Sequence, residues 1–447
     1  MTSPAPGLSP CSELYLPAAG VDLSKWCIVA CDQFTSQPEY WENAAKIVGD
    51  APSTLNIIYP EVYLNEDEAA KDARIARIEA TMKRYVDEKV VVPSEWPIYV
   101  ERTVCGHTHQ GIVVAVDLEA YEFTKNATTL IRPTEETIVE RLPPRMRIRR
   151  NAPLESPHIL LLIDDPERTV VEPLAALAAA QKLRPVYQTE LMLEGGSLAG
   201  YAVEGAARDA VYAALAALAS PAVQEAKYGA AAAKAPLLYA VGDGNHSLAT
   251  AKQIWEERKA AGDDPATSPA RYALVEINNV HDEALCFEPI HRVFEGKAAA
   301  KVFDAMKAKF GDAFAFAPME AQAAVDEVLK HGNAAPHKFA FVSKAATGVI
   351  TVTGSDKSLA VATLQPALDA ILKELKDQDL AIDYVHGESV VVELGAKDDD
   401  HCGILLPPML KSELFATVVS AGLVPRKTFS MGHANEKRYY MECRKIL

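Results

Sequence analysis

The side chains best suited to chemistry are concentrated in one short turn, Asp243-Gly244-Asn245-His246-Ser247. A carboxylate such as Asp243 can hold a metal ion, and an imidazole such as His246 can move a proton near neutral pH. Gly244 and Asn245 favour a sharp turn, because glycine and asparagine tolerate backbone angles that other residues resist. The same residue types also occur in ordinary turns, where they only cap the backbone, and the sequence leaves this alternative open.

The segments on either side of this turn predict the elements that position it. Residues 237–241 form an apolar run typical of a buried strand, and residues 248–255 carry apolar side chains at helical spacing. Asn245 or Ser247 is expected to cap that helix. Free N–H groups at a helix start attract anions, so Gly244, Asn245 and Ser247 are predicted to contact a phosphate.

Arginines crowd into residues 131–151, although the chain as a whole is acidic. Guanidinium groups bind carboxylates and phosphates through paired hydrogen bonds, so the segment predicts a clamp for an anionic substrate. Interspersed glutamates would instead favour a solvated, salt-bridged helix, and the sequence does not decide between the two. The predicted binding residues are Arg132, Arg141, Arg145 and Arg147, with Arg149 and Arg150 close behind.

Three further polar clusters are candidate ligand contacts. His291 and Arg292 follow an apolar run and are predicted to bind substrate or phosphate. Asp32 and Gln33 follow an expected strand over residues 25–30, a position where open α/β sheets often bind ligands. The C-terminal segment is expected either to form a wall of the site or to close a sheet, and it gathers Arg426, Lys427, Thr428, Ser430 and His433 around Gly432.

Two other pairs of residues could join Asp243 in a metal site. His107 and His109 are alternate residues, which face the same side of a strand. Asp164 and Asp165 end a buried apolar run, where paired carboxylates can hold Mg²⁺. A solvated loop and an ordinary Asp-Asp-Pro turn are the competing interpretations.

The length and composition of the chain predict its architecture. Its 447 residues, 49% of them hydrophobic, favour two or three domains. The sequence predicts an α+β (mixed α/β) fold, with a mixed-sheet core and Ala-rich packing helices. Residues 1–297 are expected to form the core domain that carries the motif, and residues 298–447 a smaller α+β unit that closes on it.

Charge and composition exclude several function classes. The net charge of −16 argues against a dedicated nucleic-acid or anionic-membrane protein. No apolar run approaches the roughly 18 residues needed to span a bilayer. The N-terminus lacks the features of a secretion signal and the seven cysteines are scattered, so a cytoplasmic location is expected. The partner expected is a small-molecule substrate, and a homodimer is compatible with the sequence.

Several segments resemble the bacterial family grouped as domain of unknown function 1015. In that family a hydrophobic strand runs into Asp-Gly-His-His-Arg and then into a helix. Asp243, Gly244 and His246 match this pattern, whereas Asn245 replaces its first His and Ser247 its Arg. The resemblance extends to residues 132–165, to Asp-Tyr-Val-His-Gly at 383–387 and to the closing segment Val-Pro-Arg-Lys-Thr-Phe-Ser-Met-Gly.

A more distant likeness is to the ParB/sulfiredoxin-like group, on the strand, Asp-Gly-x-His and helix pattern. Members of that group bind nucleotide phosphates at such a helix start, and some phosphorylate free serine. The resemblance implies a nucleotide-dependent phosphotransferase that uses ATP or ADP with Mg²⁺ on a small anionic hydroxy acid or amino acid. In that case Asp243 and His246 would be catalytic, and Asp243 would also hold the metal.

Two alternatives remain open at this stage. One is a metal-dependent hydrolase of a small phosphorylated metabolite, and the other is a non-catalytic protein that binds a nucleotide or metabolite. The chain contains neither GxxxxGK[ST] nor GxGxxG at a strand–helix junction, so standard P-loop and dinucleotide-binding folds are not expected.

Overall fold

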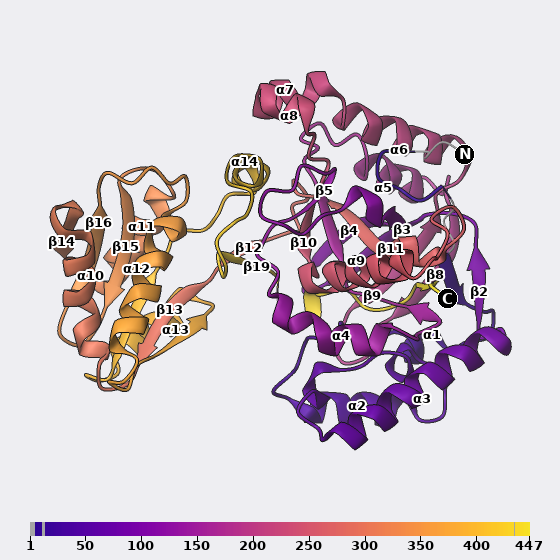
Figure 1. Cartoon of the computed structure of the whole chain (residues 1–447), viewed down its shortest axis with the longest axis horizontal. Coiled ribbons are helices and arrows are strands. Elements are labelled where there is room, and N and C mark those ends of the chain that lie inside the picture. The colour runs from indigo at the N-terminus through magenta and orange to yellow at the C-terminus, as the bar shows by residue number, and fades with distance from the viewer. Residues whose placement is uncertain (1–4, 11–13, 433) are drawn as a thin grey trace. The chain divides into compact units, whose positions relative to one another are not determined.

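The computed structural model describes residues 5–10, 14–432 and 434–447. The chain forms two compact units (Figure 1). The first unit comprises Met1–Leu285 together with Gly432–Leu447, and the second comprises Cys286–Met431. The domain boundary that the sequence predicts after residue 297 stays a prediction.

A mixed eight-stranded sheet forms the centre of the first unit. Its parallel neighbours are β5 with β10 and β7 with β11, and the other neighbours are antiparallel. The strands, in spatial order, are β5 (Ile131–Pro133), β10 (Tyr239–Asp243), β7 (Leu160–Ile163), β11 (Tyr272–Asn279), β4 (His107–Asp117), β3 (Ile98–Val104), β9 (Ser197–Ala202) and β8 (Arg184–Glu190).

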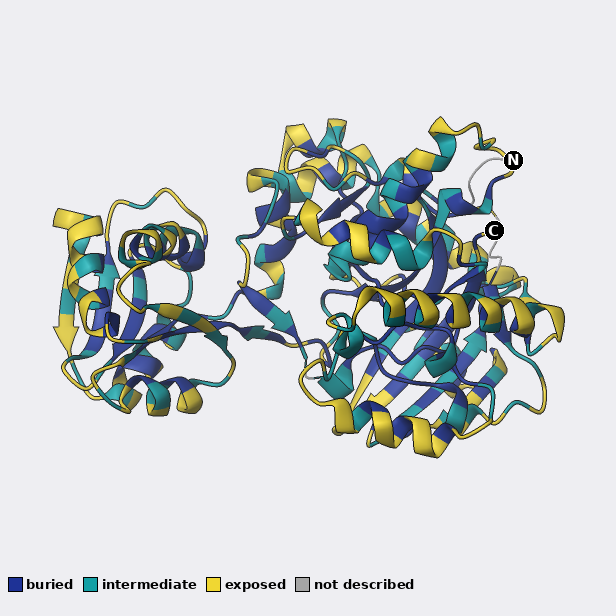
Figure 2. Ribbon diagram, turned by 60° about the horizontal axis from the view of Figure 1, so that its bottom comes forward, coloured by how far each residue is buried: buried dark blue, intermediate teal, exposed yellow. Residues whose placement is uncertain are grey.

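Both faces of this sheet are buried. Consecutive side chains of a strand point to opposite faces, and Val113 and Val114 of β4 belong to two different apolar clusters. Helices cover the two faces, and their outward sides are exposed while the strands are largely buried (Figure 2). The helices are α1 (Leu23–Trp26), α2 (Pro38–Val48), α3 (Glu68–Asp87), α4 (Leu142–Arg149), α5 (Glu172–Ala179), α6 (Gly205–Leu218), α7 (Pro221–Tyr228), α8 (Ala230–Lys234) and α9 (Asn245–Ala260).

The strand directions determine which chain segments meet at each edge of the sheet. Because β10 runs antiparallel to β7, the end of β10 lies beside the beginning of β7, and Asp243 is in register with Leu160. The end of β7 and the end of its parallel neighbour β11 lie at the opposite edge. The predicted motif and the predicted Asp164-Asp165 pair therefore lie at opposite edges of one sheet.

The C-terminal segment returns to the first unit and completes a small second sheet there. Its strand β20 pairs with both β1 and β6. This sheet has the order β2 (Val91–Ser94), β1 (Leu14–Pro17), β20 (Cys443–Lys445) and β6 (Leu154–Glu155).

The second unit is built on a six-stranded antiparallel sheet and a two-stranded ribbon of β12 (Phe287–Pro289) and β19 (Phe429–Met431). The large sheet has the order β14 (Phe314–Pro318), β16 (Thr347–Val352), β15 (His337–Val342), β18 (His401–Leu405), β13 (His291–Glu295) and β17 (Ala381–Val385). The helices of this unit are α10 (Val302–Phe310), α11 (Ala321–His331), α12 (Ala360–Leu375), α13 (Glu388–Gly395) and α14 (Lys411–Ala421).

The predicted α+β class with mixed sheets is confirmed. The expected strand over residues 25–30 is wrong, because the helix α1 ends at Trp26 and Val29 makes only an isolated bridge to Tyr439. Within the described residues, no helix is both long enough and apolar enough to cross a membrane.

Candidate functional site

The predicted strand, turn and helix are present, and Gly244 is the single residue between the end of β10 and the start of α9. Its φ of +80° is one that L side chains rarely adopt, and a Cβ built on it would lie 2.2 Å from the carbonyl oxygen of His158. Glycine is therefore required both by the backbone angle and by the close approach of a neighbouring chain segment. This local constraint fixes where α9 begins.

The capping predicted for Asn245 or Ser247 is wrong. The N-cap residue is Gly244, no side chain caps the helix, and Asn245 and Ser247 lie in its first turn. The side chain of Asn245 instead accepts a 3.3 Å hydrogen bond from the backbone N–H of Thr134. Among the described residues, the first N–H groups of α9 therefore have no side-chain acceptor, which leaves them available to an anion.

Asp243 is held by three donors at the end of β10. Its carboxylate accepts hydrogen bonds from the Lys437 ammonium at 2.7 Å and from the Gly244 N–H at 2.8 Å, and it lies 3.0 Å from Nε2 of His158. Burial raises the pKa of Asp243, but the charges and hydrogen bonds of Lys437 and His158 outweigh it and hold the pKa well below its ordinary value. Asp243 is therefore ionised at any working pH.

Sequence reasoning missed both side-chain partners of Asp243. His158 immediately precedes the apolar run of β7, where it had no feature that distinguished it from a turn residue. Lys437 lies near the end of the chain, and only the return of the C-terminal segment to the first unit brings it to β10. No local signal in the sequence could have identified Lys437.

His246 lies in the first turn of α9 and is neutral at physiological pH. Its Nε2 accepts a 3.3 Å hydrogen bond from the backbone N–H of Ile138. Burial, followed by the charges of Arg145 and Arg141, lowers the pKa of His246 to about 4. Because Nε2 is an acceptor, the single ring proton resides on Nδ1, which is left as a donor.

The structure separates the predicted arginine clamp into paired and unpaired members. Arg145 forms an ion pair with Glu61. In the described part of the chain, no hydrogen bond or ion pair reaches the guanidinium of Arg141, which is exposed near His246. The remaining arginines form salt bridges away from the turn: Arg147 with Glu68 and Asp72, Arg149 with Glu155, and Arg150 with Glu257.

Arg132 does not face this turn. Its guanidinium donates to the backbone carbonyl oxygens of Thr129 at 2.8 Å and of Ala235 at 2.5 Å. Ala235 precedes β10, whereas Asp243 ends that strand, so the contacts of Arg132 lie toward the opposite edge of the sheet. The role of Arg132 visible in the structure is to tie the start of β10 to the segment before β5.

Glu61 joins the site although sequence reasoning did not select it. Burial, the largest cause, raises the pKa of Glu61; Arg145 lowers it, and the nearby charge of Asp32 raises it again. The backbone also brings Glu61 to this position, because its N–H donates to the carbonyl oxygen of Cys31 at 2.7 Å. The predicted Asp32 thus lies near the missed Glu61, which pairs with the Arg145 guanidinium.

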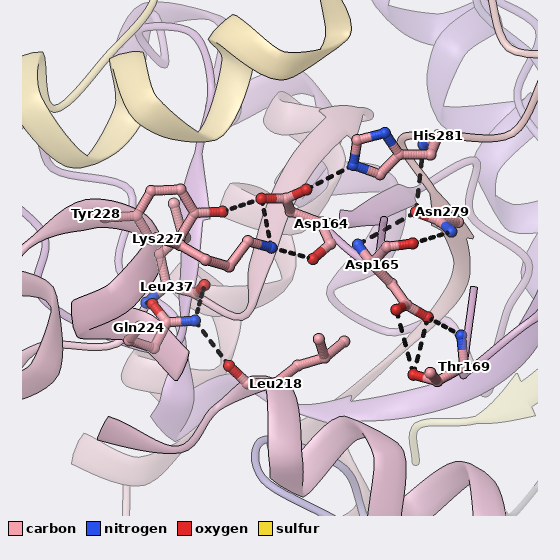
Figure 3. Close-up of polar contacts among 10 residues, drawn as sticks. All are labelled: Asp164, Asp165, Thr169, Leu218, Gln224, Lys227, Tyr228, Leu237, Asn279 and His281. Atoms are coloured by element: carbon pink, nitrogen blue, oxygen red, sulfur yellow. Dashed lines mark hydrogen bonds and ion pairs between the residues drawn. The ribbon is translucent and has the colours of Figure 1, made fainter. Parts of the chain in front are cut away.

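Asp164 and Asp165 are fully engaged at the other edge of the sheet (Figure 3). Asp164 lies 2.6 Å from the Lys227 ammonium and 2.6 Å from Nε2 of His281, and it accepts a hydrogen bond from the Tyr228 hydroxyl. Asp165 accepts from the backbone N–H of Thr169 at 2.6 Å. The pair therefore links α7 and the turn that contains Thr169 to the end of β7.

The remaining predicted contacts lie elsewhere. His107 is exposed at the start of β4 and His109 is buried on the same strand, 3.9 Å from the Glu436 carboxylate. His291 and Arg292 lie in the second unit, as do Arg426, Lys427, Thr428 and Ser430. His433 lies outside the described residues.

A divalent ion held by Asp243 does not fit the donors present. An ammonium group already occupies the Oδ2 atom of Asp243, and Oδ1 accepts the Gly244 N–H. The described residues contain no group of three or more His, Cys, Asp or Glu side chains arranged to hold a metal ion. Asp243 as a metal ligand therefore stays a prediction without support from its surroundings.

Comparison with known families identifies this chain as a member of the family described as "Protein of unknown function (DUF1015)", whose model matches residues 9–371. No curated protein matches the chain. The likeness to the ParB/sulfiredoxin-like group stays a prediction.

Several solved structures have distant similarity to the chain. A variant of free serine kinase in complex with AMP has a TM-score of 0.40 and 12% identity, covering 75% of this chain and 92% of the kinase. Another variant of that kinase, in complex with ADP, has a TM-score of 0.39 and 13% identity over the same shares. A conserved hypothetical protein from Pyrococcus furiosus has a TM-score of 0.35 and 13% identity, covering 72% of this chain and 90% of that protein.

Proposed function

We propose that this DUF1015 protein is a nucleotide-dependent phosphotransferase acting on a small anionic hydroxy acid or amino acid, such as serine. The observation that carries the proposal is the uncapped N-terminus of α9 beside the Arg141 guanidinium, which has no hydrogen bond or ion pair with any described residue. Uncapped helix N–H groups and a free guanidinium both bind phosphate oxygens. ATP or ADP would supply the phosphates.

The first turn of α9 would bind the nucleotide phosphates through three backbone N–H groups, those of Asn245, His246 and Ser247. The Nδ1–H of the neutral His246 ring would add a donor without adding charge. Arg141 would contact the phosphate oxygens from the other side, where it offers paired donors in a fixed plane. Positioning and charge stabilisation of this kind account for most of the catalysis in phosphoryl transfer.

Glu61 would be the general base of the transfer. Its raised pKa makes it a better proton acceptor than an exposed carboxylate, and its ion pair with Arg145 fixes its position. The substrate hydroxyl oxygen attacks the terminal phosphorus, and the bond between that phosphorus and the bridging oxygen of the nucleotide breaks. The hydroxyl proton passes to Glu61.

Asp243 would act as a positioning residue in this scheme. Its two oxygens are occupied by Lys437, His158 and Gly244, so it holds the turn in shape rather than contacting substrate. The ionised carboxylate also keeps the Lys437 ammonium beside the start of α9. That positive charge favours the binding of a phosphate there.

Phosphorus NMR tests the proposal directly. The full chain would be incubated with ATP or ADP and a panel of small hydroxy acids and amino acids that includes serine. We expect a new phosphate ester with the wild type, and a rate at least about 100-fold lower with Glu61→Gln. Glu61→Gln should leave nucleotide affinity unchanged, because the amide that replaces the carboxylate would retain an oxygen that can accept from Arg145.

A matched control is Glu66→Gln, which removes another carboxylate that is ion-paired with an arginine, Arg74. This variant should keep the wild-type rate. Nucleotide binding by the wild type without transfer to any acceptor would contradict the proposal and favour a non-catalytic binding protein. Release of phosphate that needs a divalent metal but no nucleotide would instead favour a metal-dependent hydrolase.

A further inference from the structure

The ring of His291, at the start of β13 in the second unit, carries a buried donor without an acceptor. Its Nδ1 accepts a 3.2 Å hydrogen bond from the backbone N–H of Leu406. The single proton of the neutral ring must therefore be on Nε2. His291 is fully buried, and its Nε2 has no hydrogen-bond partner among the described residues. A buried donor left without a partner carries a cost of about 1–3 kcal/mol.

The unpartnered Nε2–H lies near a side chain from the first turn of α13. The nearest carboxylate oxygen, on Glu388 in the first turn of that helix, lies 3.9 Å from Nε2, which is too far for a hydrogen bond. Gly387 is the N-cap residue, with a φ of +87°, and no side chain caps the helix. Because His291 pairs with Val385 across β13 and β17, the chain reaches the N-cap of α13 only two residues beyond the strand partner of His291.

Two positively charged or chargeable side chains also act on His291. Burial, followed by the charges of Arg292 and His386, lowers the pKa of His291 to about 4. The Arg292 guanidinium is itself buried, and it donates to Oε1 of Gln365 from Nε at 3.0 Å and from Nη2 at 2.7 Å. The Arg292 guanidinium therefore has a structural partner in Gln365, and it affects His291 only through its charge.

We propose that the second unit binds an oxyanion, the phosphate or carboxylate group of a small molecule, between His291 Nε2 and the first turn of α13. The anion accepts hydrogen bonds from Nε2–H and from the backbone N–H groups of Glu388 and Ser389. No described side chain accepts a hydrogen bond from either set of donors, and one group of this charge and size satisfies both. The Glu388 carboxylate faces the same place and opposes the anion, so it must turn away when the anion binds.

This site does not depend on the proposed phosphotransferase activity. It belongs wholly to the second unit, whereas the α9 site belongs to the first. A measurement that resolves individual histidines separates the two sites, because His291 reports on one and His246 on the other. If no anion binds at His291, the proposal for the α9 site is unaffected. If the α9 site binds no nucleotide, the proposal for His291 is unaffected.

The test is nitrogen NMR of the full chain labelled with ¹⁵N-histidine. His291→Gln and His246→Gln assign the two ring signals by their disappearance. Inorganic phosphate, and separately acetate, would be titrated to about 50 mM at constant ionic strength. We expect the His291 ring to be the Nε2–H tautomer and its signals to shift saturably. A response to phosphate alone identifies a phosphate site, and a response to both anions identifies a general oxyanion site.

A second variant tests the same site without removing His291. Glu388→Gln removes the opposing charge, and we expect it to lower the half-saturating phosphate concentration by about fivefold to tenfold. His401→Gln is the matched control, because His401 lies on the neighbouring strand β18 and pairs with Asp398. Its loss should not affect the titration. A His291 ring in the Nδ1–H form, or one that neither anion shifts, would overturn the proposal.

Discussion

Asp243 and Lys437 are 194 residues apart in the sequence and form a 2.7 Å ion pair. Lys437 belongs to the C-terminal segment that returns to the first unit. The next residue, Arg438, donates to the Glu442 carboxylate at 2.7 Å and lies 3.6 Å from that of Glu276 on β11. The last part of the chain therefore packs against the edge of the sheet where the motif lies.

The Asp243–Lys437 pair should be a large contributor to stability. Lys437→Met leaves the Asp243 carboxylate without its cation, and we expect a loss of about 3 kcal/mol in the free energy of unfolding, measured in urea. Asp243→Asn combined with Lys437→Met should cost less than the sum of the two single changes. Lys445→Met, at an exposed position of β20, should have little effect. Additive costs in the double variant would show that the pair does not interact.

Gly244 should tolerate no side chain. Gly244→Ala combines an unfavourable φ of +80° with a Cβ placed 2.2 Å from the His158 carbonyl oxygen. Gly106→Ala is a matched control, because Gly106 has the same φ of +80° and open space around its Cβ position. We expect Gly106→Ala to cost about 1 kcal/mol and Gly244→Ala at least about 2 kcal/mol more, by urea unfolding. Equal costs would mean that the close approach to His158 is unimportant.

Arg141 should matter for nucleotide binding but not for folding. Arg141→Gln removes a guanidinium that has no partner among the described residues, so the melting temperature should not change. We expect the dissociation constant for ATP or ADP, by titration calorimetry, to rise about tenfold. Arg150→Gln, which removes a salt-bridged arginine of the same segment, should bind nucleotide as the wild type does. Similar affinities in both variants would remove Arg141 from the site.

The buried ring of His291 should make the second unit sensitive to acid. Its pKa is lowered from 6.5 to about 4 in the folded chain, so between these values only the unfolded chain binds the proton. Stability is therefore retained above pH 6.5 and lost as the pH falls toward 4. Between pH 7 and pH 5 we expect a loss of about 2 kcal/mol from this group. His291→Gln should show a loss smaller by that amount, whereas His401→Gln should not.

The contacts of Asp164 should be structural and independent of the α9 site. Tyr228→Phe removes one of the three side chains that hold this carboxylate, and we expect a cost of about 1 kcal/mol in unfolding free energy. Nucleotide affinity should not change, because Asp164 and Asp243 lie at opposite edges of the sheet. A loss of nucleotide binding in Tyr228→Phe would place Asp164 in the functional site.

Local features of the candidate site could be predicted from the sequence because they depend on neighbouring residues. The apolar run before Asp243, the glycine at 244 and the helical spacing after Ser247 specify strand, turn and helix within a few residues. The error in capping has a longer-range cause. Asn245 forms a hydrogen bond with Thr134 on another segment, and that competing partner is not visible in the local sequence.

Partners distant in the sequence were decided by the tertiary structure alone. The crowding of arginines is visible in the sequence. Composition cannot show that Arg147, Arg149 and Arg150 pair with carboxylates while Arg141 pairs with none among the described residues. Ion pairs of this kind depend on which helices lie side by side, and charge counting cannot determine that.

The sequence by itself determined the α+β class, the family and the position of the strand–turn–helix motif, because periodicity, glycine and apolar runs act over short distances. Only the tertiary structure decided what surrounds the motif. His158 and Lys437 reach Asp243 from two separate segments, because the antiparallel pairing of β7 with β10 and the return of the C-terminal segment bring them there. Glu61 joins the site through its ion pair with Arg145. Contacts between distant segments are properties of the packed sheet and have no counterpart in local spacing.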